Sequence, residues 1–200
     1  MAIVKPAMNG TSTGSKFTGV QPVALWDFKD RSGDYDWCDI FLSVELKPQE
    51  GDYNRFLELN GRFEKDANGD ITGGFVLKRL YLFFDLIGFT GGLNKRGVWE
   101  TEKGDVIENI GTHLNERFQT GNPIMDPSYD YLAYFFKEIP RKGSQKAYTR
   151  VHHRLFPNTT KGSAEMTDHV TWMKSKNYIK EWTPSLNGTA ENQVLVSENL

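Results

Sequence analysis

Hydrophobic and polar residues alternate over three stretches in the first third of the chain, 23–30, 38–47 and 53–63. Because successive side chains of a strand point to opposite faces, each stretch predicts a strand with one buried side. The middle stretch is the clearest, and its apolar side consists of Ile40, Leu42, Val44 and Leu46. We therefore expect three consecutive strands that share a core.

The period then changes to that of a helix. Apolar residues recur at helical spacing over 75–87, and Gly88 follows where a glycine cap is expected. A second amphipathic helix is predicted after Asp105, with Ile110 and Leu114 inward, and a third over 160–182. The segment 89–99 is expected to be a loop. We interpret the helices as packing elements.

A β-hairpin is predicted over 129–157, where aromatic and β-branched residues flank a turn that contains Pro140 and Gly143. Its second arm alternates between a basic, aromatic side and a mostly apolar side. The first side holds Lys146, Tyr148, Arg150, His152 and Arg154, and the second holds Ala147, Thr149, Val151, His153 and Leu155.

This segregation predicts the register of the hairpin, since a slip by one residue would mix the two sides. The expected opposite pairs are Ile139 with Lys146, Lys137 with Tyr148, Phe135 with Arg150, and Tyr131 with Arg154. One exposed wall then combines rings, which stack on bases, with cations, which meet phosphates, as single-stranded nucleic acid requires. The candidate nucleic-acid-binding residues are Tyr131, Phe135, Lys137, Arg141, Lys142, Lys146, Tyr148, Arg150, His152 and Arg154. A solvated basic face of an edge hairpin is the alternative interpretation.

The charge distribution agrees with this location. The formal net charge is only -2, yet residues 129–156 carry six Lys or Arg against two acids. Local fields steer a charged ligand more than the sum does. Among the tryptophans, Trp26 is expected in the core, while Trp37 and Trp99 stay unranked as additional stacking platforms.

Composition restricts the remaining chemistry. Cys38 is the only cysteine, which rules out an intramolecular disulfide and a multi-thiolate metal site. The sequence predicts no catalytic residue, no metal and no cofactor. It has no apolar run like a signal peptide or a membrane span, so we expect a cytoplasmic protein without membrane contact.

The order of elements predicts a mainly β fold with α additions, a five-stranded Greek-key barrel of the oligonucleotide-binding (OB) type. A helix is expected between strands 3 and 4, and another at the C-terminal end. The predicted organisation is a flexible arm over 1–20, the barrel domain over 21–182, and a mildly acidic, disordered tail over 183–200. In OB barrels, strands 2 and 3 and the loops joining strands 1–2 and 4–5 contact the ligand.

The WDFKD opening, the long second and third strands and the YLAYFFKE…KAYTRVHHRLFP hairpin resemble the phage replicative single-stranded-DNA-binding proteins. The resemblance covers residues 22–157. It implies a protein that coats single-stranded DNA without sequence preference during phage replication or recombination, and a tail that contacts replication or recombination proteins. The tail here departs from that pattern, with only Glu191 and Glu198 as acidic side chains. The sequence does not decide whether the ligand is DNA or RNA, or whether the protein is a monomer or a homo-oligomer.

Two other functions are weighed against strand coating. A metal-dependent nuclease would use His152 and His153 for acid–base chemistry and bind a metal through Asp34, Asp36 and Asp39. Consecutive strand residues are expected to point to opposite faces, however, and these acids lie on a turn without recognisable ligand spacing. A structural or adaptor barrel that binds only protein is favoured by Glu45 and Glu58, which are expected to point outward and to repel phosphates.

Overall fold

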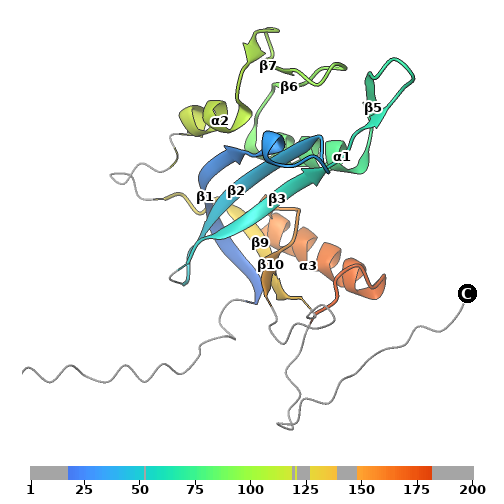
Figure 1. The fold of residues 1–200 in the computed structure, drawn as a ribbon. Helices are drawn as coiled ribbons and strands as arrows, with labels where there is room; N and C mark the ends of the chain where they lie inside the picture. The colour runs from blue at the N-terminus through green and yellow to red at the C-terminus, as the bar shows by residue number, and fades with distance from the viewer. Residues whose placement is uncertain (1–17, 52, 119, 121–126, 139–147, 182–200) are drawn as a thin grey trace, which may run out of the picture.

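The computed structural model describes residues 18–51, 53–118, 120, 127–138 and 148–181. Within them the fold is mainly β, with a nearly closed antiparallel barrel of five strands and with three α-helices (Figure 1). The barrel strands are β1 (Gly19–Asp30), β2 (Ile40–Pro48), β3 (Arg55–Gly61), β9 (Tyr131–Lys137) and β10 (Thr149–Val151). They are arranged in the order β10-β9-β1-β2-β3, and β10 approaches β3. This architecture is consistent with an OB-like barrel.

Strand β1 is long enough to pair with two neighbours. Its first residues pair with β9, where Gly19 lies opposite Phe135, and its later residues pair with β2. The register shifts between Leu25 and Asp27, as at a β-bulge. Trp26 lies at this irregularity and is only partly buried, with Lys47 Nζ 4.6 Å from its ring centroid. The expectation that Trp26 packs in the core is wrong.

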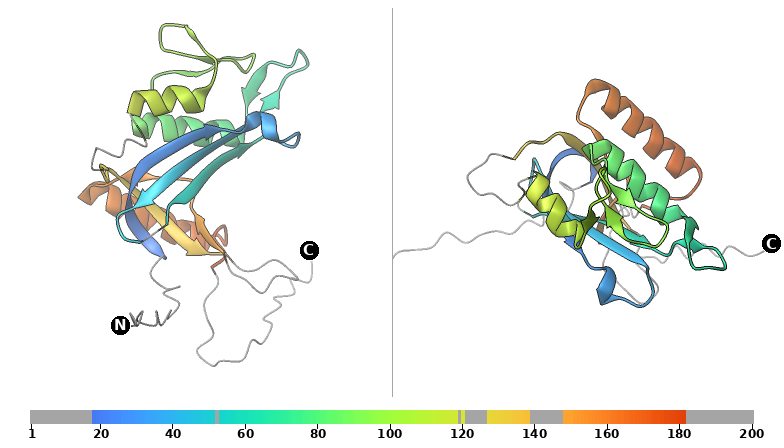
Figure 2. Two further views of the ribbon diagram at one scale, coloured as in Figure 1. Left: turned by 60° about the vertical axis from the view of Figure 1, so that its left-hand side comes forward. Right: turned by 90° about the horizontal axis from the view of Figure 1, so that it is seen from above.

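The barrel interior is filled by the side chains that the alternation predicts. Ile40, Leu42, Val44 and Leu46 on β2, with Leu57 and Leu59 on β3, are all at most 2% exposed. Helix α1 (Phe75–Ile87) lies across one end of the barrel (Figures 1 and 2) and adds buried side chains to the same core. Its predicted cap is confirmed, because Gly88 adopts a left-handed conformation with φ 66°.

Smaller elements lie beyond α1. The segment around the expected loop forms a short sheet of β6 (Gly92–Leu93), β7 (Trp99–Glu100) and β8 (Val106–Ile107). The other small elements are the 3-10 turn η1 (Ser32–Asp34), the hairpin of β4 (Glu64–Lys65) and β5 (Ile71–Gly73), and α2 (Ile110–Phe118). Asn115 of α2 joins the barrel because its amide bonds both the N–H and the C=O of Phe28, at 2.9 and 2.8 Å.

Strand β9 is buried on both faces. Ala133 and Phe135 face the barrel core, whereas Leu132 and Tyr134 pack under α3 (Thr160–Ser175). The short strand β11 (Phe156–Pro157) pairs with β9 immediately before α3 begins. Thr159 caps the helix, its Oγ1 accepting the Gly162 N–H at 3.0 Å. The second cluster under α3 consists of Leu132, Tyr134, Phe156, Met166, Val170 and Ile179.

Several predicted segments lie outside the described residues. These are most of the arm over 1–20, the basic turn that holds Arg141, Lys142 and Lys146, and the tail over 183–200. In the part of the chain that is described, no helix has the length and apolar character needed to cross a membrane.

Candidate nucleic-acid interface

The connection between β1 and β2 brings three aromatic rings together outside the barrel core. We call Tyr35, Trp37 and Phe41 the ring cluster. The Tyr35 ring stacks on Phe41 with centroids 5.0 Å apart, and the Trp37 ring lies 5.7 Å from Tyr35 and 6.1 Å from Phe41. Trp37 is 51% exposed and Phe41 only 5%. The cluster therefore presents an accessible indole on a buried aromatic base.

Hydrogen bonds to backbone groups fix the connection that carries these rings. Arg31 N–H donates to the Phe41 carbonyl at 2.8 Å, and Phe41 N–H donates to Ser32 Oγ at 3.0 Å. From the other side, Arg62 Nε donates to the Trp37 carbonyl at 2.9 Å. A ring held in place before binding loses little conformational entropy when a ligand stacks on it.

A cation lies against the same rings. The guanidinium carbon of Arg31 lies 5.1 Å from the ring centroids of both Tyr35 and Phe41. Its Nε bonds Asp34 at 3.0 Å, and this hydrogen bond raises the pKa of Arg31. The ion pair is solvent-exposed, and exposed pairs contribute little to stability. A phosphate oxygen can therefore compete with Asp34 for the guanidinium.

Asp39 anchors the end of the same connection. Its carboxylate accepts hydrogen bonds from Phe63 N–H at 2.8 Å and from Lys65 Nζ at 2.7 Å. Partial burial opposes ionisation of Asp39, but these two bonds outweigh it and lower its pKa. Asp39 thus stabilises the end of this connection, and its charge is paired with Lys65, so it does not add a free negative charge beside the rings.

The neighbouring outer face of β2 and β3 has mixed character. Phe56 of β3 is 50% exposed and lies opposite Glu45 of β2, and Glu58 lies opposite Ser43. Glu45 accepts a hydrogen bond from Asn54 Nδ2 at 2.7 Å. A stacking platform is present here, but these carboxylates oppose phosphates.

The predicted register of the hairpin is wrong by one residue. Lys137 lies opposite Thr149, and Phe135 lies opposite Val151. Phe135 is 1% exposed in the barrel core, so the four residues Phe135, Lys137, Tyr148 and Arg150 do not form one exposed wall. The physical reason is α3, which covers the opposite face of β9, so that both faces of this strand are apolar and its alternation carries no register signal.

Two more candidate residues, His152 and Tyr131, are buried or half-buried. His152 is 3% exposed. Tyr131 is half-buried against the core, and burial, with a smaller contribution from Asp130, raises the pKa of its hydroxyl. The accessible candidates are Tyr148, which is 60% exposed, and Arg150, whose Nε pairs with Glu138 at 2.9 Å. Lys137 and Arg154 are half-buried, and Arg141, Lys142 and Lys146 lie outside the described residues.

The adjacent histidines also differ from expectation. Strand β10 ends at Val151, and the chain leaves the ladder before β11 pairs Phe156 with Leu132. The rings of His152 and His153 consequently lie 4.1 Å apart, so the prediction that they point to opposite faces is wrong. Across the described ranges, no group of three or more His, Cys, Asp or Glu is arranged to hold a metal ion.

The ring cluster was only partly visible in the sequence. The sequence marks Trp37 only as an unranked platform and gives Tyr35 and Phe41 no functional role. The available signal is three rings that closely follow a Ser-Gly-Asp turn, next to the loop that contacts the ligand in OB barrels. Comparison with models of known protein families found no match, and comparisons with curated proteins and with solved structures found none either.

Proposed function

We propose that this protein binds single-stranded nucleic acid, without sequence preference and without catalysis, through the ring cluster and the adjoining outer face of the barrel. The observation that supports this most strongly is the exposed Trp37 held on Tyr35 and Phe41, with the Arg31 guanidinium against two of the rings. Rings supply sequence-tolerant stacking, and cations meet the backbone. Stacking of one base on Trp37 contributes roughly 1–3 kcal/mol.

The β9–β10 hairpin does not offer the exposed wall of rings and cations that the sequence predicts, because Phe135 is buried. Tyr148 and Arg150 keep a supporting role as an exposed ring and an exposed cation at the start of β10.

We further propose that the barrel is a Greek-key OB fold in which α1 occupies the position between the third and fourth strands. Under this proposal the chain acts like the phage replicative single-stranded-DNA-binding proteins that its sequence resembles, coating DNA during replication or recombination in the cytoplasm of an infected host. Contacts of the tail with replication or recombination proteins, and self-association, belong to the same proposal.

Fluorescence anisotropy with a labelled poly-dT oligonucleotide tests the function. We expect the parent to bind and Trp37→Ala to weaken binding by about 5- to 150-fold, the range that corresponds to one stacked base. Tyr81→Ala, on α1 and 40% exposed, is the matched control and should bind like the parent. Equal affinity of the parent and Trp37→Ala would show that the ring cluster is not the interface. A parallel titration with poly-U compares RNA with DNA.

A barrel that binds only protein is the second candidate. The outward carboxylates of Glu45 and Glu58 beside the exposed Phe56 favour it, because they repel phosphates. Absence of any poly-dT or poly-U binding at low salt would support this role. Cleavage of labelled DNA in magnesium or manganese, abolished by a chelator, would instead support a nuclease.

A further inference from the structure

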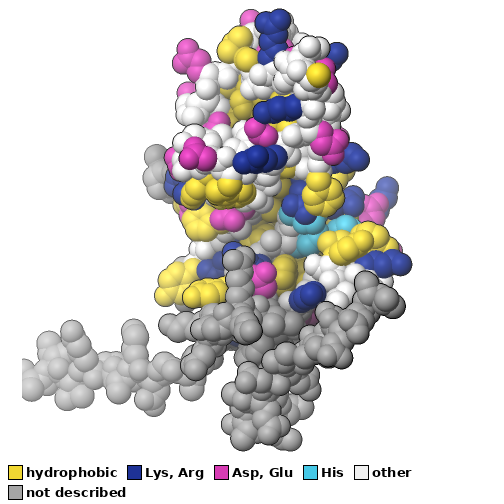
Figure 3. Space-filling model, turned by 45° about the vertical axis from the view of Figure 1, so that its right-hand side comes forward, with side chains coloured by type: hydrophobic (Ala, Val, Ile, Leu, Met, Phe, Trp, Pro, Cys, Tyr) yellow, Lys and Arg dark blue, Asp and Glu magenta, His cyan; other side chains and the backbone are white. Residues whose placement is uncertain are grey.

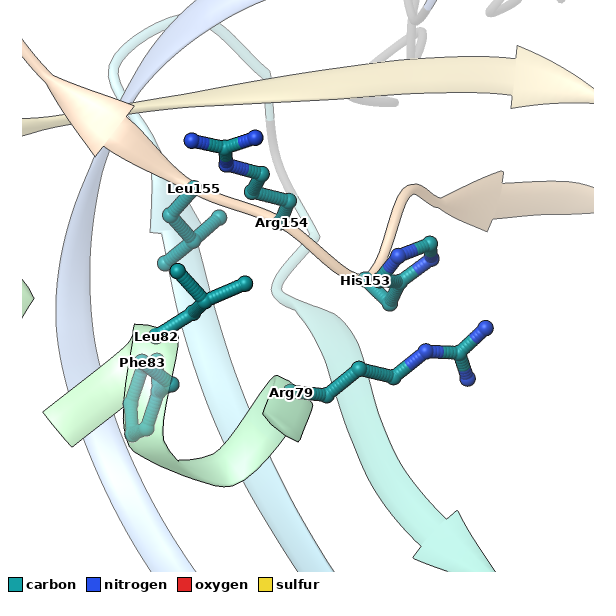
Figure 4. Close-up of a pocket in the computed structure, with 6 residues that line it drawn as sticks. All are labelled: Arg79, Leu82, Phe83, His153, Arg154 and Leu155. Carbon is teal, nitrogen blue, oxygen red and sulfur yellow. The ribbon is translucent and has the colours of Figure 1, made fainter. Parts of the chain in front are cut away.

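A cleft separates α1 from the segment that joins β10 to β11. It is lined by Arg79, Leu82 and Phe83 of α1 and by His153, Arg154 and Leu155 of that segment. In Figure 4 the side chains of Arg79 and His153 extend to the same side of the cleft, whereas Arg154 extends the other way. Figure 3 shows histidines gathered in a recess here, bordered by hydrophobic and basic side chains.

Rings continue from this cleft onto α3. The His153 ring contacts Phe75 at 6.4 Å and His152 at 4.1 Å, and the His152 ring lies 5.1 Å from His169 of α3. His169 is in turn 6.1 Å from Trp172, which is 49% exposed. We call Arg79, His152, His153, Arg154 and His169 the basic cleft.

The basic cleft contains buried nitrogen atoms without hydrogen-bond partners. Within the described residues these are Nε of Arg79 and Nε2 of His152 and His169. His152 Nδ1 accepts the Arg154 backbone N–H at 3.3 Å, so the neutral ring carries its proton on Nε2. The Arg79 and His152 atoms are therefore donors, and a buried donor without an acceptor is costly.

The charges in the cleft are all of one sign. Neither Arg79 nor Arg154 forms an ion pair with any described residue, and each instead lies over a ring, Phe75 at 4.1 Å and Phe156 at 4.5 Å. Burial, and then the basic neighbours His152, Arg79, His169 and Arg154, lower the pKa of His153 to about 3. An anion would relieve both the missing acceptors and the unbalanced charge.

We propose that the basic cleft is a phosphate-binding site, in which Arg79 and His153, whose side chains extend to the same side of it, donate to phosphate oxygens. This phosphate site goes beyond the proposed function, because it uses no residue of the ring cluster. The phosphate comes either from the backbone of a bound strand or from a terminal or free phosphate, since both present the same acceptor oxygens.

Titration of the full chain with inorganic phosphate, followed through the histidine side-chain signals by NMR, tests the site. We expect saturable shifts at His153 and His152, and Arg79→Gln should weaken phosphate binding about tenfold, the loss of one charge-assisted contact. Arg96→Gln, an equal charge change on an exposed loop, should leave binding unchanged. Absence of saturable shifts, or equal losses in both variants, would overturn the site.

Because Arg79 is half-buried, its replacement is accompanied by a thermal unfolding measurement and by a second variant. His153→Phe keeps a ring against Phe75 but removes the N–H donor, so it should also weaken phosphate binding. Parent-like phosphate binding by a folded Arg79→Gln or His153→Phe protein would contradict the proposal.

Two oligonucleotide arms identify the source of the phosphate. If a strand backbone occupies the cleft, Arg79→Gln should weaken binding of dT oligonucleotides with and without a 5′-phosphate alike. If a terminal phosphate occupies it, only the phosphorylated oligonucleotide should bind less well. The proposed function and the proposed phosphate site can be contradicted independently, because Trp37→Ala tests the ring cluster and Arg79→Gln tests the basic cleft.

Discussion

Phe135 of β9 lies directly opposite Val151 of β10, and its ring belongs to the barrel core together with Ala133 of the same strand. Tyr148, three residues before Val151, is 60% exposed. The hairpin thus separates two aromatic residues that perform different tasks, since one ring holds the barrel together and the other is available to a ligand.

Replacing Phe135 with alanine should lower the free energy of unfolding by about 3–5 kcal/mol, because it removes a buried ring and leaves a cavity. Tyr148→Ala should change stability by less than about 0.5 kcal/mol. Urea unfolding followed by circular dichroism measures both. Equal stability of the two variants would contradict the burial of Phe135 in the barrel core.

Arg31 should contribute an electrostatic contact to strand binding. In Arg31→Gln we expect the slope of log K against log salt concentration to become shallower by about 0.7, the value for one single-strand phosphate. Anisotropy titrations with poly-dT at several salt concentrations measure the slope. Arg96→Gln serves as the control, and an unchanged slope in Arg31→Gln would remove this cation from the interface.

The ion pair between Arg150 and Glu138 holds the guanidinium away from a ligand. Glu138→Gln should release Arg150 and tighten poly-dT binding by about two- to threefold at low salt, consistent with the small energy of an exposed pair. Glu165→Gln, which breaks the exposed pair with Lys161 on α3, is a matched control. Tightening in both variants would indicate an effect of net charge alone.

Stability should decrease in acid because of His152, which is buried, and His153, which is half-buried. Burial, followed by the charge of His169, lowers the pKa of His152 to about 4, and burial followed by His152 lowers that of His153 to about 3. The groups that face them are Arg79 from α1, His169 from α3 and Arg154 from their own segment. No carboxylate among these compensates a positive imidazole.

Both folded pKa values lie below the unfolded value of about 6.5. The unfolded chain therefore binds more protons between these values, and the stability present above pH 6.5 is lost as the pH falls toward 4 and 3. Each histidine contributes a slope of about 1.4 kcal/mol per pH unit in this window. Urea unfolding at pH 7, 6 and 5 should show the loss, and His152→Phe should reduce it.

Gly162 should be intolerant of a side chain. A Cβ placed there would lie 2.0 Å from the Pro157 carbonyl oxygen, so α3 would have to move away from β11. Gly162→Ala should therefore lower the melting temperature, although alanine favours helix. Ser163→Ala, at an exposed neighbouring position, is the control. A higher melting temperature in Gly162→Ala would contradict the close approach of α3.

Much of the barrel was predictable because hydrophobic periodicity is local. The apolar side of β2, the bounds of α1 and its Gly88 cap follow from the spacing of residues a few positions apart. That the β1–β2 connection contacts a ligand stays a prediction, because it rests on the expected fold type and not on local periodicity.

The sequence alone determined where the long barrel strands and the three helices form, and which of them carry rings and cations. Only the tertiary structure decided which face each side chain occupies. Strand β9 is covered by the barrel on one side and by α3 on the other, so Phe135 enters the core, and the irregular segment after Val151 brings His152 onto His153. Register and burial depend on the element packed against a strand, and that element lies far away in the sequence.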